Sequence, residues 1–598
     1  MCGIVGFVGS GHREAALAMN ARQVHRGPDD DGLFVDDART LALAMRRLAI
    51  IDVVDGAQPM TDASGDFVIV FNGEIFNAPS LRAELESQGA RFHTHHSDTE
   101  VILQLFLLYG ERCVDRLNGM FAFAILDRRR NRLVLARDPL GIKPLFYWHG
   151  TRKFAFASEI KSLLTLPNVS RDIDMDSLGF YLSLQYTPPA HSIYSAVHKL
   201  PAGQVLTFDL ATHETRHATY WSPPVGTSHP FSDPRELRER LETATANWMM
   251  SDVPVGVSLS GGIDSAAIVG LLASRGFRLK TWTLGFVDDS GGNHDERHLA
   301  RLVADRWGTE HQEVVMRPDT LLNDLDTIVE QLDEPYGGGL PSWYVFREMS
   351  HEVKVALTGT GGDELFGNYG KWRRMNFPGW GWATRRARSL QAHGVAECLA
   401  HPHGSLFKVQ FGERDKRKIA PTASGSIPSM LETLWWGSGA LDPRQAVACV
   451  DLRTQLPEEF LMMTDRFSMY WSVEARTPLL DRELVDYVMR LPPNLRSPGG
   501  ALKGALIDAV RDLLPPPLLD IPKRGFVLPT AAWLRGTLRP LLDRYFDSAF
   551  LQKQGLFHAN LHERFVQPHL SGHHDFSEKL WTLLMFQMWW QRNAGAST

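Results

Sequence analysis

An apolar strand that ends directly in a Ser-Gly-Gly turn and a helix constrains this sequence more than any other feature. Residues 253–260 predict the strand, and the apolar spacing of residues 265–274 predicts the helix. Further strands are predicted at 281–286, 312–316 and 353–357, with helical stretches between them. This alternation favours a doubly wound parallel sheet, in which ligands bind at the carboxyl ends of the strands.

The turn has the composition of an anion-binding loop. It comprises Ser258-Leu259-Ser260-Gly261-Gly262-Ile263-Asp264-Ser265. Glycines let the backbone approach an anion closely, while serine hydroxyls and the N–H groups at a helix start donate to it. The carboxylate of Asp264 repels an anion, so it suggests a bridging metal ion. No GxxxxGK[ST] pattern is present, which excludes the usual NTPase phosphate loop; the alternative is a glycine-rich turn without a ligand.

A second glycine cluster follows the apolar strand predicted at 353–357. It comprises Thr358-Gly359-Thr360-Gly361-Gly362-Asp363. Because the carboxyl ends of parallel strands meet at one edge of a sheet, we expect Asp363 to lie near Asp264. Two such carboxylates suit Mg²⁺ bound through pyrophosphate oxygens.

Cysteine is the second residue of the chain, directly after Met1. Removal of Met1 gives Cys2 both a thiol and a free α-amine. An α-amine titrates near ~8 and a thiol near ~8.5, so the amine can accept the thiol proton around neutral pH. Nucleophile and general base then belong to one residue, as in enzymes with an N-terminal threonine. The alternative is a small residue that only permits removal of Met1.

The two halves of the chain differ in their patterns. Up to about Leu210, short apolar runs alternate with turns, which predicts a sheet-rich domain. The stretch from Tyr220 to Pro234 is rich in proline and serine and predicts a linker, and from about Trp372 the periodicity is mainly helical. We therefore expect a first domain at 2–215, a linker at 216–235 and a second domain at 236–598.

Composition excludes several classes of protein. A formal net charge of -6 favours neither a nucleic acid nor an anionic membrane as partner. The 4 cysteines include no CxxC pair, which argues against disulfides and zinc and fits a reducing compartment. No apolar run reaches the ~18 residues of a membrane span, and the start lacks the basic segment of a signal peptide. We expect a cytoplasmic protein.

Taken together, the motifs resemble those of glutamine-dependent asparagine synthetases over nearly the whole chain. The SGGxDS loop is similar to the PP-loop of ATP-pyrophosphatases, and the first half resembles a class II glutamine amidotransferase domain. The resemblance implies an α/β multidomain fold: an N-terminal Ntn-hydrolase αββα sandwich, then a doubly wound PP-loop domain with a helical C-terminal extension. The motifs in the first half are Met1-Cys2-Gly3-Ile4, His25-Arg26-Gly27-Pro28-Asp29, Arg47-Leu48-Ala49-Ile50-Ile51-Asp52, Phe71-Asn72-Gly73-Glu74, Ser97-Asp98-Thr99-Glu100 and Arg137-Asp138-Pro139-Leu140-Gly141.

The resemblance assigns chemistry to the first domain. Cys2 is implied as the nucleophile that attacks the side-chain amide of glutamine. The Asn72 side chain and the Gly73 backbone N–H are implied as the oxyanion hole, whose donors oppose the developing charge.

The same resemblance implies the residues that bind the rest of glutamine. Arg47 pairs with the α-carboxylate as a planar fork, and Asp98 pairs with the α-ammonium, with Glu74 nearby. From the sequence alone, Arg47 can equally be a surface ion-pair partner and Asp98 a helix N-cap.

In the second half the resemblance implies binding of ATP and of magnesium pyrophosphate, the latter at Asp264 and Asp363. Lys523, in Pro522-Lys523-Arg524-Gly525-Phe526, matches the lysine expected to meet the phosphates. For Glu474, Arg476 and Asp481, a buried structural ion-pair network is an equal alternative to a role at the site. The implied ATP-binding residues are Ser258, Ser260, Gly261, Gly262, Asp264, Ser265, Leu284, Thr358 and Gly359.

Two departures from the family pattern bear on the acceptor acid. The family usually has an acidic residue at the position of Thr360, where it is linked to formation of the β-aspartyl-AMP. The residues Gly337-Gly338-Gly339 stand where the family supplies side chains, so we expect a widened pocket with Trp343 in it.

The implied reaction is asparagine synthesis. Glutamine is hydrolysed to glutamate and ammonia, ATP with Mg²⁺ adenylates the side-chain carboxylate of aspartate, and ammonia displaces AMP. Amidation of another carboxylate, such as a sugar uronic acid of a surface polysaccharide or a secondary metabolite, is the alternative. A third alternative is that the chain is a binding protein without catalytic activity. The partners are then small molecules, and the family often forms dimers, which leaves a homodimer open.

Overall fold

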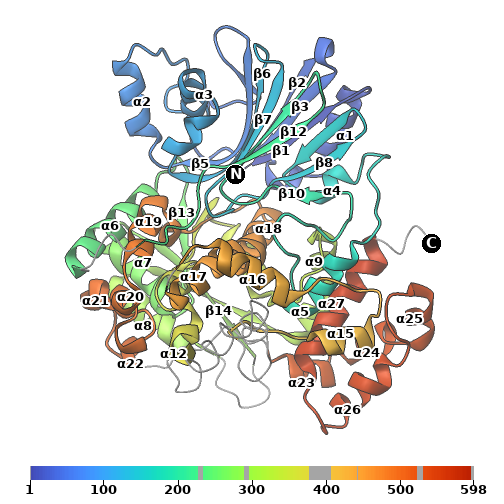
Figure 1. The fold of residues 1–598 in the computed structure, drawn as a ribbon. Coiled ribbons are helices and arrows are strands. Elements are labelled where there is room, and N and C mark those ends of the chain that lie inside the picture. Colours follow the sequence, from blue (N-terminus) through green and yellow to red (C-terminus); the bar gives the residue numbers. More distant parts are fainter. Residues whose placement is uncertain are drawn as a thin grey trace.

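The computed structural model describes residues 2–226, 233–287, 295–375, 406–440, 442–520 and 529–593. Two sheet-containing parts lie one above the other in Figure 1, the N-terminal part at the top and the remainder of the chain below. The upper part contains two six-stranded sheets, and the lower part contains a five-stranded sheet. The chain is therefore a multidomain α/β protein, as the motifs imply.

The two upper sheets are antiparallel throughout and pack face to face. Their strand orders are β10-β8-β9-β1-β3-β2 and β12-β11-β7-β6-β5-β4. The first sheet contains β1 (Cys2–Val8), β2 (Asp30–Asp36), β3 (Leu41–Arg47), β8 (Phe146–Gly150), β9 (Lys153–Ala157) and β10 (His198–Lys199). The second contains β4 (Met60–Thr61), β5 (Phe67–Ile75), β6 (Gly119–Asp127), β7 (Arg132–Arg137), β11 (Gln204–Asp209) and β12 (Thr215–Thr219).

Strand β5 explains why the apolar runs of this half are continuous. Successive side chains of a strand point to opposite faces. Val68 and Val70 lie in the core between the two sheets, whereas Ile69 and Phe71 pack toward the helices that cover the second sheet. Those helices are α2 (Ala78–Ser87) and α3 (Asp98–Tyr109), while α1 (His12–Ala21) covers the first sheet.

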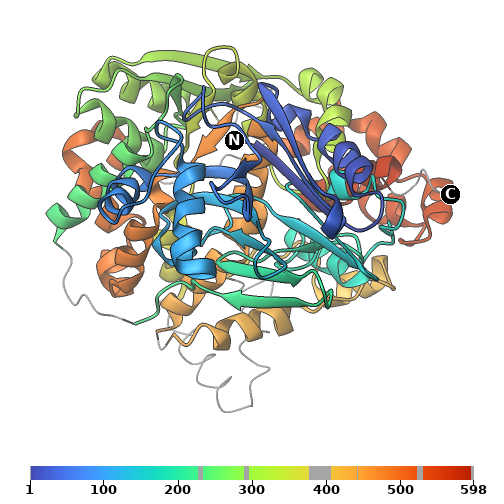
Figure 2. The same ribbon diagram turned by 90° about the horizontal axis from the view of Figure 1, so that it is seen from above.

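Figures 1 and 2 show α1 and α3 on opposite sides of the paired sheets. Each of the two sheets is thus covered by the other sheet on one face and by helices on the other. This confirms the αββα sandwich that the motifs imply.

The lower sheet is parallel, with the strand order β15-β14-β13-β16-β17. Helices α7 and α8 cover one face, and α10 and α18 cover the other, which confirms the doubly wound arrangement. The strands are β13 (Val255–Ser258), β14 (Lys280–Phe286), β15 (Glu310–Met316), β16 (Val355–Leu357) and β17 (Glu474–Arg476). The helices are α7 (Ile263–Ala273), α8 (Arg297–Trp307), α10 (Pro341–Met349) and α18 (Met462–Tyr470).

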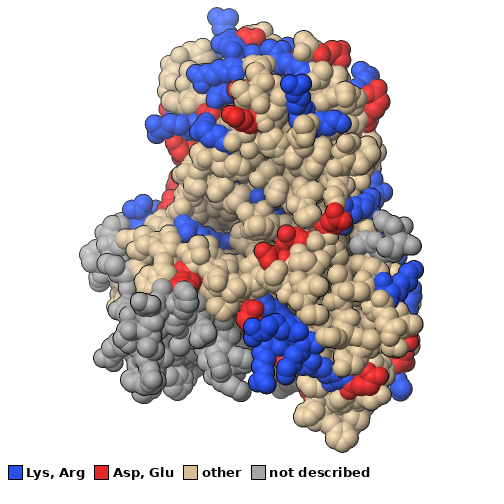
Figure 3. All heavy atoms as spheres, turned by 45° about the vertical axis from the view of Figure 1, so that its right-hand side comes forward, with Lys and Arg blue, Asp and Glu red and all other residues tan. Residues whose placement is uncertain are grey.

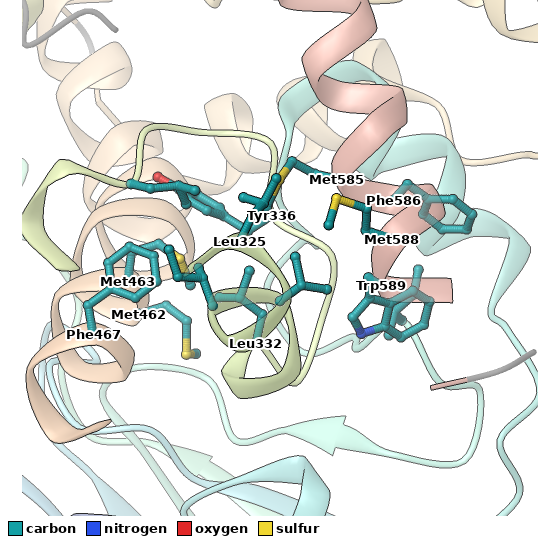
Figure 4. Packing of buried hydrophobic residues seen from close by; sticks show 14 of the residues in the cluster. Leu325, Leu332, Tyr336, Met462, Met463, Phe467, Met585, Phe586, Met588 and Trp589 are labelled. Atoms are coloured by element: carbon teal, nitrogen blue, oxygen red, sulfur yellow. The ribbon is translucent and has the colours of Figure 1, made fainter. Parts of the chain in front are cut away.

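The C-terminal helices complete the core on one side of this sheet. In Figure 4, α9 (Pro318–Gln331) lies between α18 and the long helix α27 (Ser577–Asn593). Met463 and Phe467 approach it from α18, and Met588 and Trp589 approach it from α27. The indole Nε1–H of Trp589 donates to the backbone carbonyl of Asp333 at 3.2 Å. This packing fixes the segment that follows α9, and it confirms the helical C-terminal extension.

Regular secondary structure reaches into both ends of the segment 216–235, which was expected to be a linker. Strand β12 (Thr215–Thr219) pairs with β11 and so extends the second sheet into that segment. Helix α6 (Pro234–Asn247) begins within the same segment and is capped by the side chain of Asp233, which accepts from the backbone N–H of Arg235.

Lys and Arg side chains on the face in Figure 3 gather over the N-terminal part and in one patch lower down. Acidic side chains lie between them, and the middle of the face is mostly uncharged. None of the described helices is both long and apolar enough to cross a membrane.

A buried network of ion pairs joins the two domains. Arg26, which is fully buried, contacts both carboxylate oxygens of Asp465 on α18, at 2.7 and 3.1 Å, and Glu159 at 3.0 Å. Arg466 contacts the same Glu159 at 3.1 Å and Asp333 at 2.8 Å. Burial alone would lower the pKa of Arg26, but the carboxylates of Asp465 and Glu159 outweigh it and raise that pKa.

Breaking this network should be costly. Removal of one partner from a buried pair leaves an uncompensated charge and costs about 3–5 kcal/mol, whereas an exposed pair contributes about 0–1 kcal/mol. We therefore expect Asp465→Ala to lower the free energy of unfolding in urea by about 3 kcal/mol or more. Asp31→Ala, which removes the exposed partner of Arg46, is the control. Equal effects of the two substitutions would contradict this account of the domain boundary.

Candidate active sites

Cys2 begins strand β1 in the interior of the sandwich, with 7% of its surface exposed. Its backbone N–H donates to Oδ1 of Asn72 on β5 at 2.9 Å, and its carbonyl accepts from Nε of Arg26 at 3.1 Å. The register of β1 and β3 places Arg47 opposite Cys2. The two sheets thus bring together three of the residues implied to act on glutamine.

The side chain of Asn72 is oriented for use as a donor. It is completely buried, and its Oδ1 is engaged by Cys2. Its amide nitrogen Nδ2 has no acceptor among the described residues. Gly73 follows with a φ of 153°, and a Cβ there would lie 2.0 Å from the carbonyl oxygen of Met120, so only glycine fits. An unengaged buried donor beside the thiol is what an oxyanion hole requires.

Burial raises the pKa of the Cys2 thiol. A thiol with a raised pKa is a weak nucleophile unless a base takes its proton. The environment of Cys2 therefore supports the proposal that the base belongs to the same residue, as the freed α-amine.

The guanidinium of Arg47 holds the loop that follows β3. Its Nη1 donates to the carbonyl of Val53 at 3.0 Å, and its Nη2 donates to those of Ile51 and Asp52 at 3.3 and 2.7 Å. Three of its five N–H groups are used in this way, which leaves donors for a carboxylate. Arg47 is 6% exposed, so a surface ion pair, the alternative role, is wrong.

Asp98 and Glu74 form a buried acidic cluster at the domain boundary. Oδ2 of Asp98 accepts from the backbone N–H of Ile75 at 2.9 Å, and Oε1 of Glu74 lies 4.0 Å from Nη2 of Arg476 on β17. Burial raises the pKa of Asp98 to about 6, and burial together with Glu474 and Asp98 raises the pKa of Glu74 well above its ordinary value. Buried carboxylates so close together suit a ligand ammonium group, which relieves their repulsion.

The raised pKa predicts a pH dependence. Below pH 6 the carboxyl group of Asp98 is neutral, and only the ionised form attracts an ammonium group. We expect kcat/KM for glutamine hydrolysis to fall about tenfold per pH unit below that value. Asp98→Asn should lower kcat/KM and remove this limb of the profile. An unchanged acidic limb in Asp98→Asn would show that another group titrates.

The second site is a cavity of about 470 Å³ at the carboxyl ends of β13, β14 and β16. Gly261 and Gly262 do not line it; Gly261 has a φ of 79°, which turns the loop into α7. The residues that line it and that were implied in ATP binding or adenylation are Ser258, Ser260, Asp264, Ser265, Leu284, Thr358, Gly359, Thr360 and Asp363.

The two glycine loops pack directly on each other at one end of this cavity. A Cβ on Gly359 would lie 2.8 Å from the backbone nitrogen of Ser265, and a Cβ on Gly362 would lie 2.3 Å from Oδ1 of Asp264. The hydroxyls of Ser260 and Ser265 lie 3.1 Å apart. The missing side chains therefore allow Asp264 and Asp363 to share one end of the cavity.

A lysine that the motifs did not indicate lies between these two carboxylates. Nζ of Lys503 contacts Oδ2 of Asp264, and it lies 3.3 Å from Oδ1 of Asp363. Burial would lower the pKa of Lys503, but the two carboxylates outweigh it and raise that pKa. Lys503 precedes α21 (Gly504–Val510) and belongs to no motif. Lys523, implied for this role, lies outside the described residues.

The donor set at this end of the cavity fits Mg²⁺. Two aspartates supply hard oxygen ligands, and Gly362 leaves the space beside Asp264 that a Cβ would fill. Asp264 and Asp363 would hold the ion, which would supply positive charge for the phosphates, and Lys503 would add a second positive charge.

Lys503→Met should therefore abolish use of ATP, because it leaves the carboxylates of Asp264 and Asp363 facing the phosphates without this cation. We expect pyrophosphate release with ammonia as nitrogen donor to fall below detection, while glutamine hydrolysis stays within about twofold. Lys418→Met, on the exposed face of α15 (Glu413–Ile419), should change neither activity. Normal pyrophosphate release by Lys503→Met would contradict the assignment.

The expected widening of the acceptor pocket is largely wrong. A Cβ on Gly337 would meet the side chain of Gln185 at 3.0 Å, and one on Gly338 would meet the hydroxyl of Tyr336 at 2.2 Å. These two glycines are thus packed against neighbours, and only Gly339 lines the cavity.

Trp343 does not line the cavity either. It is 1% exposed and stacks on Tyr470 with ring centroids 4.5 Å apart. The helical period of α10 turns Ser342, Val345 and Phe346 toward the cavity and Trp343 into the core.

Three late motif residues are structural. Arg476 donates to Glu474 at 2.6 Å and to the carbonyls of Trp248 and Met250. Asp481 caps α19 (Arg482–Arg490) and accepts from Nδ2 of Asn118 at 2.9 Å and from Nε1 of Trp248 at 3.0 Å. Glu474 and Arg476 thus form a buried ion pair, as in the structural alternative, whereas Asp481 caps a helix and forms no ion pair with the described residues.

Comparison with protein families agrees with this geometry. The family described as "Asparagine synthase" matches residues 236–591, and the one described as "Glutamine amidotransferase domain" matches residues 1–221. The chain belongs to the asparagine synthase family. It is 31% identical to asparagine synthetase [glutamine-hydrolyzing] 1 of Bacillus subtilis, over 98% of this chain and 96% of that one. It is 29% identical to asparagine synthetase [glutamine-hydrolyzing] 3 of the same organism, over 93% and 94%.

A fungal relative has a different name. The protein called amidase chry2 of Gibberella zeae is 27% identical over 93% of each chain. Proteins of this length and similarity are thus not all named for asparagine synthesis.

Proposed function

We propose that this protein is a glutamine-hydrolysing asparagine synthetase that acts in the cytoplasm. One observation carries the proposal: the Cys2–Asn72 site and the Asp264–Lys503–Asp363 cavity occur in one chain, on domains joined by a buried ion-pair network. Membership of the asparagine synthase family supports it. A homodimer is compatible with the family.

In the first step, Cys2 attacks the side-chain amide of glutamine after its α-amine has taken the thiol proton. Nδ2 of Asn72 and the backbone N–H of Gly73 stabilise the developing oxyanion, and the proton returns to the leaving ammonia. Arg47 binds the α-carboxylate, while Asp98 and Glu74 bind the α-ammonium. Water then releases glutamate from Cys2.

In the second step, the acceptor carboxylate attacks the α-phosphorus of ATP and pyrophosphate leaves. Lys503 and the backbone N–H groups of the Ser260 loop stabilise the charge on the phosphates. Asp264 and Asp363 would hold Mg²⁺, which would neutralise further phosphate charge. Ammonia attacks the acyl-adenylate, loses a proton and displaces AMP.

The packing between the two sites leaves a small cavity that could form part of the route of ammonia. A small cavity of about 20 Å³ is lined by Arg466, Leu332 and Met462, and it shares Tyr336 and Met463 with the wall of the nucleotide cavity. Its walls adjoin the network that reaches Cys2 through Arg26.

One observation favours another acceptor. Thr360 lines the nucleotide cavity with its hydroxyl 3.2 Å from that of Thr358, where the family usually has a carboxylate. A glutamine-dependent amidotransferase acting on a different carboxylate is therefore the second candidate function.

The proposal is tested with the full chain, glutamine, ATP, Mg²⁺ and aspartate. We expect equimolar AMP, pyrophosphate and asparagine. Cys2→Ala should abolish glutamine use but retain synthesis from added ammonia, because the nucleophile serves only the first site. Cys113→Ala, a buried cysteine remote from both sites, is the matched control and should retain both activities. Glutamate release without asparagine would favour the second candidate, and loss of both activities in Cys2→Ala would contradict separate sites.

A further inference from the structure

The wall of the nucleotide cavity beyond the glycine loops carries two carboxylates. Glu364 lies on α11 (Gly362–Leu365) and Glu459 on the π-helix η5 (Leu456–Leu461), and both line the cavity. Glu364 is 1% exposed, and Glu459 is half-buried. These residues have no part in the reaction steps described above.

Glu364 is only partly satisfied by the protein. Its Oε1 accepts from the hydroxyl of Tyr369 at 2.5 Å, whereas its Oε2 is buried and has no hydrogen-bond partner. An unpaired oxygen on a buried carboxylate costs free energy that a folded chain usually avoids. This oxygen lies on the wall of a ligand cavity, so a ligand can supply the missing donor.

The described lysines nearest this part of the wall make their ion pairs with other carboxylates. Among the described residues, none forms an ion pair with Glu364 or Glu459. Lys371, the lysine nearest in sequence to Tyr369, contacts both oxygens of Asp451 at 2.7 Å. Lys408 contacts Glu578 on the surface. Burial raises the pKa of Glu459 to about 7, against the opposing effects of Lys408, Lys371 and Gln455, whose Nε2 donates to Oε2 of Glu459 at 2.8 Å.

The surroundings also suit a positive group. The rings of Tyr369 and Phe460 lie 5.8 Å apart, and both line the cavity together with Tyr336. Aromatic faces attract ammonium groups, most strongly where water is excluded. Carboxylates and aromatic rings on one wall are acceptors for the N–H groups of a primary ammonium.

This wall lies on the side of the cavity where we expect the acceptor acid, and not the phosphates of the nucleotide, to bind. Thr360 stands four residues before Glu364 and lines the same cavity, at the position linked to adenylation of the acceptor. The phosphate-binding cation Lys503 lies instead at the end shared by Asp264 and Asp363. An acid whose carboxylate reacts beside Thr360 can therefore extend its other groups toward Glu364.

We propose that Glu364 and Glu459 bind the ammonium group of the acceptor, so that this enzyme selects an amino acid over an acid without an amine. The inference rests on the proposed function and adds to it the class of substrate. A sugar uronic acid has no ammonium group and leaves Oε2 of Glu364 without a charged donor. The wall therefore counts against the second candidate function that Thr360 favours.

The test compares aspartate with succinate, which has the same carbon chain and carboxylates but no amine. Pyrophosphate release is measured with the full chain, ATP, Mg²⁺ and ammonia. A charged hydrogen bond to an ammonium group corresponds to about ten- to hundredfold in binding. We expect kcat/KM to be lower for succinate than for aspartate by at least that factor. Equal use of both acids would overturn the inference while leaving the proposed function intact. If neither acid supports pyrophosphate release, the result would count against both the inference and the proposed function.

Variants locate the effect. Glu364→Gln and Glu459→Gln should each raise KM for aspartate about tenfold or more and reduce the preference for aspartate over succinate. The KM for ATP and the rate of glutamine hydrolysis should stay unchanged. Glu459→Asp, which keeps the charge, should retain part of the preference. A changed Mg²⁺ requirement with unchanged KM for aspartate would show that the carboxylates bind metal instead, and would overturn the inference. If the variants do not fold, the comparison of aspartate with succinate in the unmodified protein decides.

Discussion

Arg26 is buried between the two domains, and its guanidinium contacts both the carbonyl of Cys2 and the carboxylate of Asp465. A buried charge requires compensation, and Asp465 and Glu159 supply it for Arg26. Movement of Arg26 away from these carboxylates would leave buried charges unpaired. The start of β1 is thereby tied to α18 of the second domain. The orientation of the nucleophile and the position of the helix that walls the nucleotide cavity depend on the same contact.

The two sites share one physical feature. Packing holds the catalytic groups in place, and a polar or charged group of the protein is left for the ligand to pair with. In the first site Asn72 has an unengaged donor, and Asp98 and Glu74 are buried together. In the second site Glu364 has an unpaired oxygen. Preorganised groups of this kind cost stability in the absence of ligand and need no rearrangement when the ligand binds.

Local sequence patterns were sufficient to predict functional residues that are neighbours in the sequence, as in Ser258–Ser265. Long-range partners had no local signal: Lys503 is 239 residues from Asp264, and Arg26 is 439 residues from Asp465. Trp343 was wrongly expected in the pocket because its neighbourhood is glycine-rich, whereas the period of α10 turns it into the core. Fold class and both loops could thus be predicted, but the groups that complete the site could not.

The central claim is that nitrogen released at Cys2 reaches an adenylated amino acid in the same molecule. It is tested most directly with glutamine labelled with ¹⁵N in its amide, supplied with ATP, Mg²⁺, aspartate and an excess of unlabelled ammonium chloride. The account predicts that the amide of the asparagine formed carries the label despite the excess. Asparagine with only unlabelled nitrogen, formed while glutamine is hydrolysed, would contradict it.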